Sequence, residues 1–111
     1  MGESAPEVRD NAAAHRLEVE IDGKLAIVDY NLISGGIVVA HTEVPPPLEG
    51  RGIASAMYRA LIARAREEGR RVIPVCPVFA LYLKRHAEAQ DVLDPGYRRS
   101  LGLPPLEPPA S

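Results

Sequence analysis

The chain has 111 residues, which is enough for one small domain. Its formal net charge is -2 at pH 7, so it lacks the excess of positive charge that is typical of nucleic-acid-binding proteins. No apolar stretch approaches the roughly 20 residues that span a bilayer, and no apolar signal-peptide core follows the first residues, so we expect a cytoplasmic protein without a membrane partner. Cys76 is the single cysteine. A single cysteine cannot form an intramolecular disulfide, and the sequence has no cysteines at the spacing of a metal site, so no metal is expected.

The first half of the chain predicts an antiparallel sheet of three strands. Apolar and charged residues alternate over Arg16–Ile21, which indicates a half-buried strand. Asp22-Gly23 is a typical hairpin turn and leads into a second strand over Lys24–Ile33. A second Gly-containing turn precedes the third strand, Ile37–Val44. Short turns between consecutive strands favour a meander.

The second half predicts a strand–helix–strand crossover. Apolar residues recur every four positions over Ile53–Glu68, which indicates a helix with one buried stripe. A short apolar strand, Arg71–Val75, follows and should run parallel to the third strand with a right-handed connection. Pro74 has no N–H group, so this strand cannot be fully paired at that position.

A further helix is expected over Pro77–His86, with Val78, Leu81 and Tyr82 on one face, and Glu88–Leu93 would add a turn. Prolines preclude a long helix after Asp94, and about the last ten residues are predicted to be flexible. We therefore expect three segments: a flexible N-terminal segment over 1–14, a folded domain over 15–93 and a Pro-rich C-terminal tail over 94–111.

The junction between the third strand and the long helix reads Glu49-Gly50-Arg51-Gly52-Ile53. The first turn of a helix leaves N–H groups unpaired, and the helix dipole adds partial positive charge there. Glycine permits unusual backbone conformations and a close approach by a ligand, and Arg51 adds a full positive charge. The junction is thus a candidate phosphate or diphosphate site, although such a turn can also be a turn and nothing more.

Val44, Pro46 and the run from Glu49 to Ala54 resemble the acetyl-CoA signature of the GNAT N-acetyltransferase superfamily. That signature reads Gln/Arg-x-x-Gly-x-Gly/Ala after a strand that ends in Val-x-Pro, and Glu49 takes the place of the usual Gln or Arg. The segments His41–Pro45 and Val72–Cys76 are similar to a short single-domain subfamily. The resemblance implies an α/β (α+β) minimal GNAT-like fold and acetyl-CoA as cosubstrate. The residues then predicted to bind it are Val44, Glu49, Gly50, Arg51, Gly52, Ile53, Ala54 and Ser55.

Three residues are candidates for catalysis: Cys76, His41 and Glu43. Cys76 directly precedes Pro77, a good first residue for a helix, and helix N-termini favour the thiolate form of cysteine. Cys76 is therefore a candidate nucleophile or proton donor, or else a buried structural cysteine.

Strand alternation places His41 and Glu43 on one face, together with Ile37 and Val39. An imidazole can deprotonate a thiol or an amine, and GNAT enzymes often use a glutamate on this strand as general base. Both residues could instead be ordinary polar side chains.

The function that the resemblance implies is acetyl transfer to a primary amine. GNAT enzymes have two helices between their first two strands, whereas Asp22-Gly23 joins the strands directly here. The acceptor side is then open, or completed by a macromolecule or by another subunit of a homodimer, which favours a peptide lysine or a polyamine. Two alternatives remain: a non-catalytic acyl-CoA-binding module, and a structural domain whose Gly-rich turn binds nothing.

Overall fold

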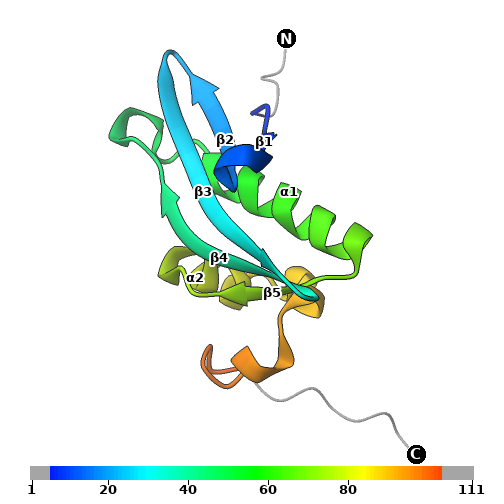
Figure 1. Cartoon of the computed structure of the whole chain (residues 1–111). Coiled ribbons are helices and arrows are strands. Elements are labelled where there is room, and N and C mark those ends of the chain that lie inside the picture. Colours follow the sequence, from blue (N-terminus) through cyan, green and yellow to red (C-terminus); the bar gives the residue numbers. More distant parts are fainter. Residues whose placement is uncertain (1–5, 104–111) are drawn as a thin grey trace, which may run out of the picture.

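The computed structural model describes residues 6–103, which form one five-stranded sheet with α1 lying across one of its faces (Figure 1). The strands lie in the order β1-β2-β3-β4-β5. Their bounds are β1 Arg9–Asn11, β2 Arg16–Ile21, β3 Lys24–Ile33, β4 Gly36–Glu43 and β5 Arg71–Pro74. The helices are α1 Ile53–Glu68 and α2 Pro77–Arg85, with short 3-10 turns η1 Ala12–Ala14, η2 Pro46–Leu48, η3 Ala87–Val92 and η4 Pro95–Tyr97.

The predicted meander and crossover are confirmed. Strands β2, β3 and β4 pair antiparallel, and β4 pairs parallel with β5 after the α1 connection. The third strand begins and ends one residue earlier than predicted, and both β5 and α2 end one residue earlier. The fold class is thus an α/β domain of the expected kind, with one additional strand.

That additional strand is β1, which lies in the N-terminal segment for which we expected flexibility. Residues 9–14 form β1 and η1, and β1 pairs with β2. Glu18 on β2 holds the strand in place, because it accepts hydrogen bonds from Asn11 at 3.0 Å and Arg9 at 3.5 Å. Arg16 also donates to Glu18 at 2.7 Å, and these partners lower the pKa of the Glu18 carboxyl, Arg16 most of all.

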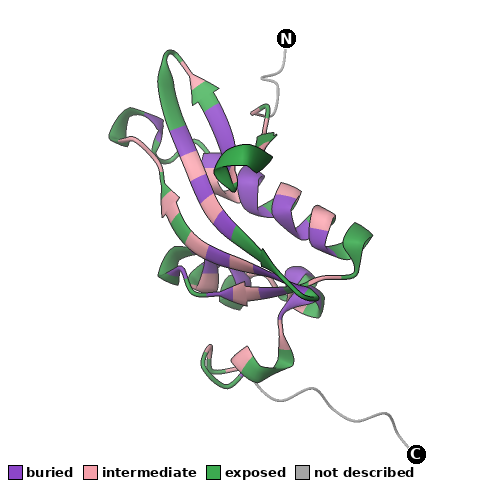
Figure 2. Ribbon diagram, in the orientation of Figure 1, coloured by how far each residue is buried: buried purple, intermediate pink, exposed green. Residues whose placement is uncertain are grey.

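The core lies between α1 and the face of the sheet that α1 covers (Figure 2). The four-residue spacing in the sequence predicted the buried stripe of α1 correctly, since Ile53, Met57, Leu61 and Ala65 are all buried. Val19 and Val28 are buried on the sheet side. Burial of an apolar side chain of this size contributes roughly 1.5–3 kcal/mol to the stability of the folded state.

A β-bulge in β4 breaks the alternation that the sequence predicted. His41 pairs with Asp29, but Tyr30 pairs with Val39, so Ala40 is an extra residue on β4. Directly paired residues share a face of the sheet, and Val28 and Tyr30 lie on the α1 side. Their partners Thr42 and Val39 therefore also lie on the α1 side.

The prediction that His41 and Glu43 share a face with Ile37 and Val39 is consequently wrong. Ile37 and Val39 are fully buried under α1, whereas His41 and Glu43 are exposed. One extra residue shifts the two-residue period of a strand, and every side chain after it changes face relative to those before it.

The buried face of α2 also differs from the prediction. Phe79, Tyr82 and Leu83 are buried, but Val78 and Leu81 are 53% and 46% exposed. The helix lies against α1 through its aromatic residues, so it turns a different face inward from the one that hydrophobicity alone indicated. Two apolar side chains of α2 are therefore left at the surface.

Strands β4 and β5 separate beyond the pair Val39 and Pro74. The N–H of Cys76 donates to the carbonyl of Val39 at 2.8 Å, which is the last backbone contact between the two segments in the described part of the chain. β4 continues to Glu43 without β5 beside it. The separation begins after Pro74, where the N–H of Val75 donates back to the carbonyl of Ile73 at 3.1 Å and not to β4.

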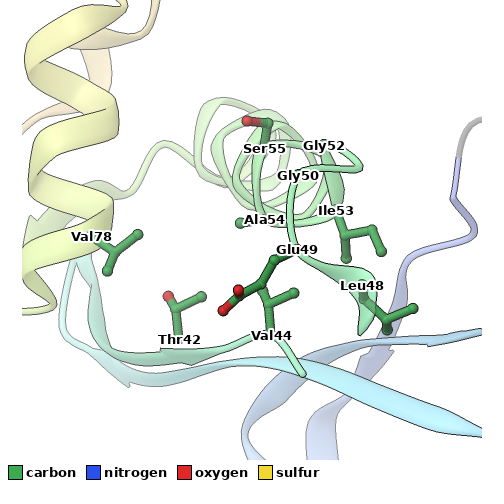
Figure 3. Close-up of a pocket in the computed structure, with 10 residues that line it drawn as sticks. All are labelled: Thr42, Val44, Leu48, Glu49, Gly50, Gly52, Ile53, Ala54, Ser55 and Val78. Carbon is green, nitrogen blue, oxygen red and sulfur yellow. The ribbon is translucent and has the colours of Figure 1, made fainter. Parts of the chain in front are cut away.

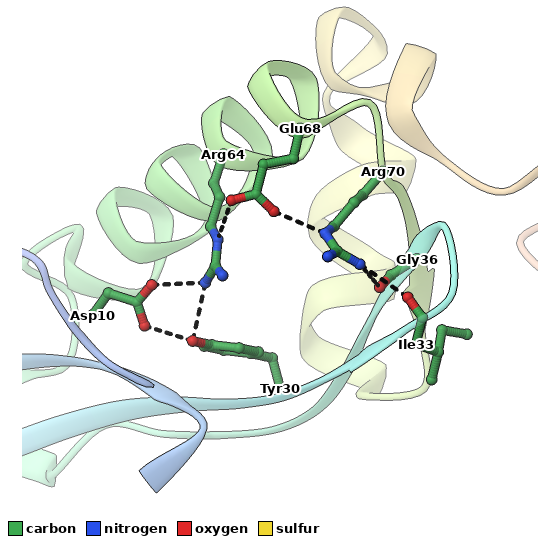
Figure 4. A network of polar contacts seen from close by, with 7 residues as sticks. All are labelled: Asp10, Tyr30, Ile33, Gly36, Arg64, Glu68 and Arg70. Atoms are coloured by element: carbon green, nitrogen blue, oxygen red, sulfur yellow. Dashed lines mark hydrogen bonds and ion pairs between the residues drawn. The ribbon is translucent and has the colours of Figure 1, made fainter. Parts of the chain in front are cut away.

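A polar network fastens the C-terminal half of α1 to the sheet (Figure 4). Arg64 contacts Asp10 at 2.6 Å, the Tyr30 hydroxyl at 3.0 Å and Glu68 at 3.0 Å. The Tyr30 hydroxyl donates to Asp10 at 2.5 Å. Arg70 donates hydrogen bonds to the Glu68 carboxylate and to two backbone carbonyls at the β3–β4 turn. Desolvation, with a further contribution from Asp10, raises the pKa of Tyr30. The network fixes the orientation of α1, whose other end forms the candidate site.

The chain after η3 packs against the sheet before the described residues end. Leu93 forms an isolated parallel bridge with Val72, and Leu101 and Leu103 are packed against the core. Most of the tail that we predicted to be flexible, residues 104–111, lies outside the described residues.

Candidate active site

A pocket of about 390 Å³ lies where β4, the N-terminus of α1 and the N-terminus of α2 meet (Figure 3). It opens at the place where β4 has lost its β5 partner. The lining residues are Thr42, Val44, Leu48, Glu49, Gly50, Gly52, Ile53, Ala54, Ser55 and Val78.

The N–H groups of residues 50–55 have no protein acceptor within the described part of the chain. Gly50 and Gly52 have φ values of 78° and 75°, a conformation that disfavours residues with a side chain. Gly52 is the N-cap of α1, and its carbonyl accepts from Ala56 to begin the helix. Free amides and the positive end of the helix dipole thus lie beside the pocket, an arrangement suited to phosphate groups.

Seven of the eight residues predicted to bind the cofactor line this pocket, and Arg51 is the one that does not. Arg51 is exposed and adds positive charge beside the pocket. The Glu49 carboxylate lies over the pocket floor near Val44 and Thr42 (Figure 3). Its negative charge opposes an anionic ligand at short range.

Behind the pocket, three side chains form a buried polar cluster of Thr42, Tyr58 and Cys76. The Thr42 Oγ1 lies 2.7 Å from the Tyr58 hydroxyl oxygen and 3.4 Å from the Cys76 Sγ. Cys76 is the N-cap of α2, as predicted, and is 2% exposed. Burial raises the pKa of Tyr58, and the proximity of Cys76 raises it further, so Tyr58 keeps its proton.

His41 and Glu43 lie on the opposite face of β4 from Thr42. The His41 Nε2 is 3.1 Å from the Glu43 Oε2, and both side chains are exposed. Within the described residues neither is hydrogen-bonded to Cys76, whose side chain lies instead beside Thr42 and Tyr58. The structure therefore pairs two of the predicted catalytic residues with each other and separates both from the third.

The sequence patterns do not mark Thr42, Leu48, Val78 or Tyr58 as site residues. Thr42 is adjacent to His41, and only the bulge decides which of the two faces α1. Tyr58 follows Ala54 by four positions on α1, a helical spacing that could have placed it below the pocket. Helical periodicity predicts a buried face for Val78, whereas the residue is exposed and lines the pocket.

In residues 6–103, no group of three or more His, Cys, Asp and Glu side chains could hold a metal ion. The described helices include none with the length and apolar composition needed to cross a membrane.

Comparison with known proteins agrees with this fold. The family model described as GCN5-related N-acetyl-transferase matches residues 16–92. Among solved structures, a GCN5-like protein from Staphylococcus aureus, determined in solution by NMR, superimposes with a TM-score of 0.67. That protein is 24% identical, and the match covers 83% of this chain and 91% of the other. No curated protein matches the chain.

The family match spans well over half of the chain and includes the Gly-rich junction, β4 and Cys76. The chain is a member of the GCN5-related N-acetyltransferase (GNAT) family. The structural likeness, at its level of identity, establishes the fold.

Proposed function

We propose that this protein transfers an acetyl group from acetyl-CoA to a primary amine. The observation that carries the proposal is the set of unpaired amides over residues 50–55, most of which belong to residues that line a pocket at the N-terminus of α1. A diphosphate seated there would place the rest of CoA along the pocket toward Thr42. The thioester would then lie where β4 and β5 separate, which is the expectation from the family.

The acceptor amine would approach from the other face of the sheet, where His41 and Glu43 lie. Both are exposed, and their hydrogen bond lets the pair take up a proton from an incoming ammonium group. The β2–β3 connection is the tight turn at Asp22-Gly23, and no helix of the described chain lies between these strands. An open approach of this kind supports an extended acceptor such as a peptide lysine or a polyamine.

The position of Cys76 favours direct attack by the amine over an acetyl-Cys76 intermediate. Cys76 is 2% exposed and does not line the pocket, whereas Thr42 lies between its sulfur and the pocket. Incubation with acetyl-CoA alone and measurement of the intact mass separates the two routes. We expect no gain of one acetyl group, and a stoichiometric gain would establish the covalent route.

The function itself is tested by incubating the protein with acetyl-CoA and a panel of amines, including lysine peptides and spermidine, and following release of free CoA thiol. A parallel measurement of the thermal midpoint with and without CoA reports binding, since a ligand of the folded state must raise the midpoint. Binding without turnover would support the alternative of an acyl-CoA-binding module, and absence of both would reject the proposal.

A further inference from the structure

Thr42 is the pocket-lining residue that connects the pocket with the buried polar cluster. Its hydroxyl contacts both Tyr58 and Cys76, and its side chain forms part of the pocket floor (Figure 3). The bulge at Ala40 turns Thr42 toward α1, where these contacts are made. Bulges often re-aim a side chain beside an active site.

The hydrogen-bonding capacity of the cluster permits an arrangement in which the Thr42 proton is directed toward the pocket. A threonine hydroxyl has one hydrogen to donate and two lone pairs to accept with. Tyr58 and Cys76 are 1% and 2% exposed, and Thr42 is a side-chain acceptor within reach of both. If each buried neighbour donates to Thr42, both lone pairs are used and the Thr42 O–H is left to point into the pocket.

Tyr58 is suited to a fixed donor role. Its ring lies against Phe79 and Tyr82, with centroid distances of 4.8 Å and 5.1 Å, so the hydroxyl has little freedom to move. Burial raises its pKa, which disfavours loss of its proton. Cys76 differs, because it lies at the N-terminus of α2, where the helix dipole stabilises negative charge.

We infer that Thr42 delivers a proton to the departing sulfur of CoA, that Cys76 replaces this proton, and that Tyr58 is a positioning residue that orients the Thr42 hydroxyl. The inference rests on the proposed function. It assigns to Thr42 a role in the pocket and explains how the buried thiol could act without touching the substrate.

The amine nitrogen forms a bond to the thioester carbon, the carbon–sulfur bond breaks, and its electron pair goes to the sulfur. The sulfur takes the proton of Thr42 Oγ1, while Oγ1 takes the proton of Cys76 Sγ. Cys76 is left as a thiolate at the N-terminus of α2 and regains a proton from water after the products leave. The extra proton of the amine is lost toward His41 and Glu43.

The test compares Thr42→Val, which keeps the shape and removes the hydroxyl, with Thr42→Ser, which keeps the hydroxyl. We expect kcat of Thr42→Val to fall about 100-fold or more, while Thr42→Ser stays within about 5-fold of the wild type. CoA affinity, measured by calorimetry, should change by less than about 3-fold in both, since the loss lies in proton transfer.

Tyr58→Phe supplies a second variant in case Thr42→Val does not fold, as judged from its thermal midpoint. Its kcat should fall about 10-fold with CoA affinity retained, because the Thr42 hydroxyl loses its fixed orientation. Retention of full kcat by a folded Thr42→Val, or by Tyr58→Phe where Thr42→Val is unfolded, overturns the relay. If the wild type releases no CoA thiol with any amine, the proposed function fails and the relay fails with it. An active wild type with an equally active Thr42→Val rejects the relay alone.

Discussion

Val39 and Thr42, three positions apart on β4, lie on the same face of the sheet, although regular alternation would place them on opposite faces. The extra residue at Ala40 produces this arrangement, since Val39 pairs with Tyr30 and Thr42 pairs with Val28. Val39 can therefore end the pairing with β5 while Thr42 reaches the α1 side and lines the pocket. The bulge places a hydroxyl, rather than an imidazole, next to Cys76.

Replacing Gly50 or Gly52 by alanine should weaken CoA binding. Both residues have positive φ and open space where a Cβ would lie, so the cost is conformational strain and not a clash. We expect a loss of stability of about 1–2 kcal/mol and a weaker CoA affinity, because the loop relaxes away from the geometry that aims its amides. Urea unfolding and calorimetry measure the two effects.

Gly23→Ala is the matched control for the glycine variants. Gly23 has a φ of 77°, also with open space around its Cβ position, but it lies in the turn between β2 and β3, away from the pocket. It should lose similar stability and keep the CoA affinity of the wild type. Equal affinities for all three variants would show that the Gly50–Gly52 loop does not hold the ligand.

Glu49→Gln should bind CoA more tightly than the wild type. The carboxylate lies in the pocket, where a diphosphate would meet it. Removing one like charge near a partly exposed anion should make the binding free energy about 1 kcal/mol more favourable, which is roughly a 5-fold lower Kd. The gain in affinity should be smaller at high salt. Glu67→Gln removes an exposed charge on α1 away from the pocket and should leave Kd unchanged. A weaker affinity in Glu49→Gln would indicate that Glu49 contacts the ligand favourably.

Val78 and Leu81 allow a test of the pocket mouth on α2. Both are exposed, but only Val78 lines the pocket. Val78→Asp should raise KM for acetyl-CoA about 10-fold, because it places a negative charge in an apolar part of the pocket lining. Leu81→Asp makes the same chemical change one turn further along and should leave KM unaltered. Steady-state kinetics on the two variants would contradict the assigned pocket if they gave the same KM.

Acid should weaken the attachment of β1 to the sheet. Hydrogen bonds from Arg16 and Asn11 lower the pKa of Glu18 in the folded state. A carboxyl whose pKa is lower in the folded state than in the unfolded state stabilises the folded state at pH values above its unfolded pKa. This stabilisation is lost as the pH falls through the folded-state pKa. The unfolding free energy should therefore decline below about pH 4.5, the ordinary value for a glutamate side chain.

Glu18→Gln should show a shallower decline over that acidic range, as measured by urea unfolding at a series of pH values. Glu20→Gln on the same strand is the control, since Glu20 is more exposed and its one ion pair, with Arg9, is longer at 3.6 Å. Parallel pH dependences of Glu18→Gln and the wild type would rule out the Glu18 carboxylate as the source of the decline.

The sequence by itself determined the features that depend on neighbouring residues. Alternation gave the bounds of β2 and β3, helical spacing gave α1 and its buried stripe, and the paired glycines indicated a loop with free amides before Ile53. These follow from backbone geometry and local side-chain periods, which act over a few residues along the chain.

Only the tertiary structure decided which side chains meet behind the pocket. The bulge at Ala40 depends on the register between β3 and β4, and the buried face of α2 depends on where Tyr58 lies on α1. Thr42 and Cys76 are far apart in sequence and become neighbours because β5 brings the start of α2 beside β4. Register and packing between distant segments are set by the whole core, so no local pattern in the chain encodes them.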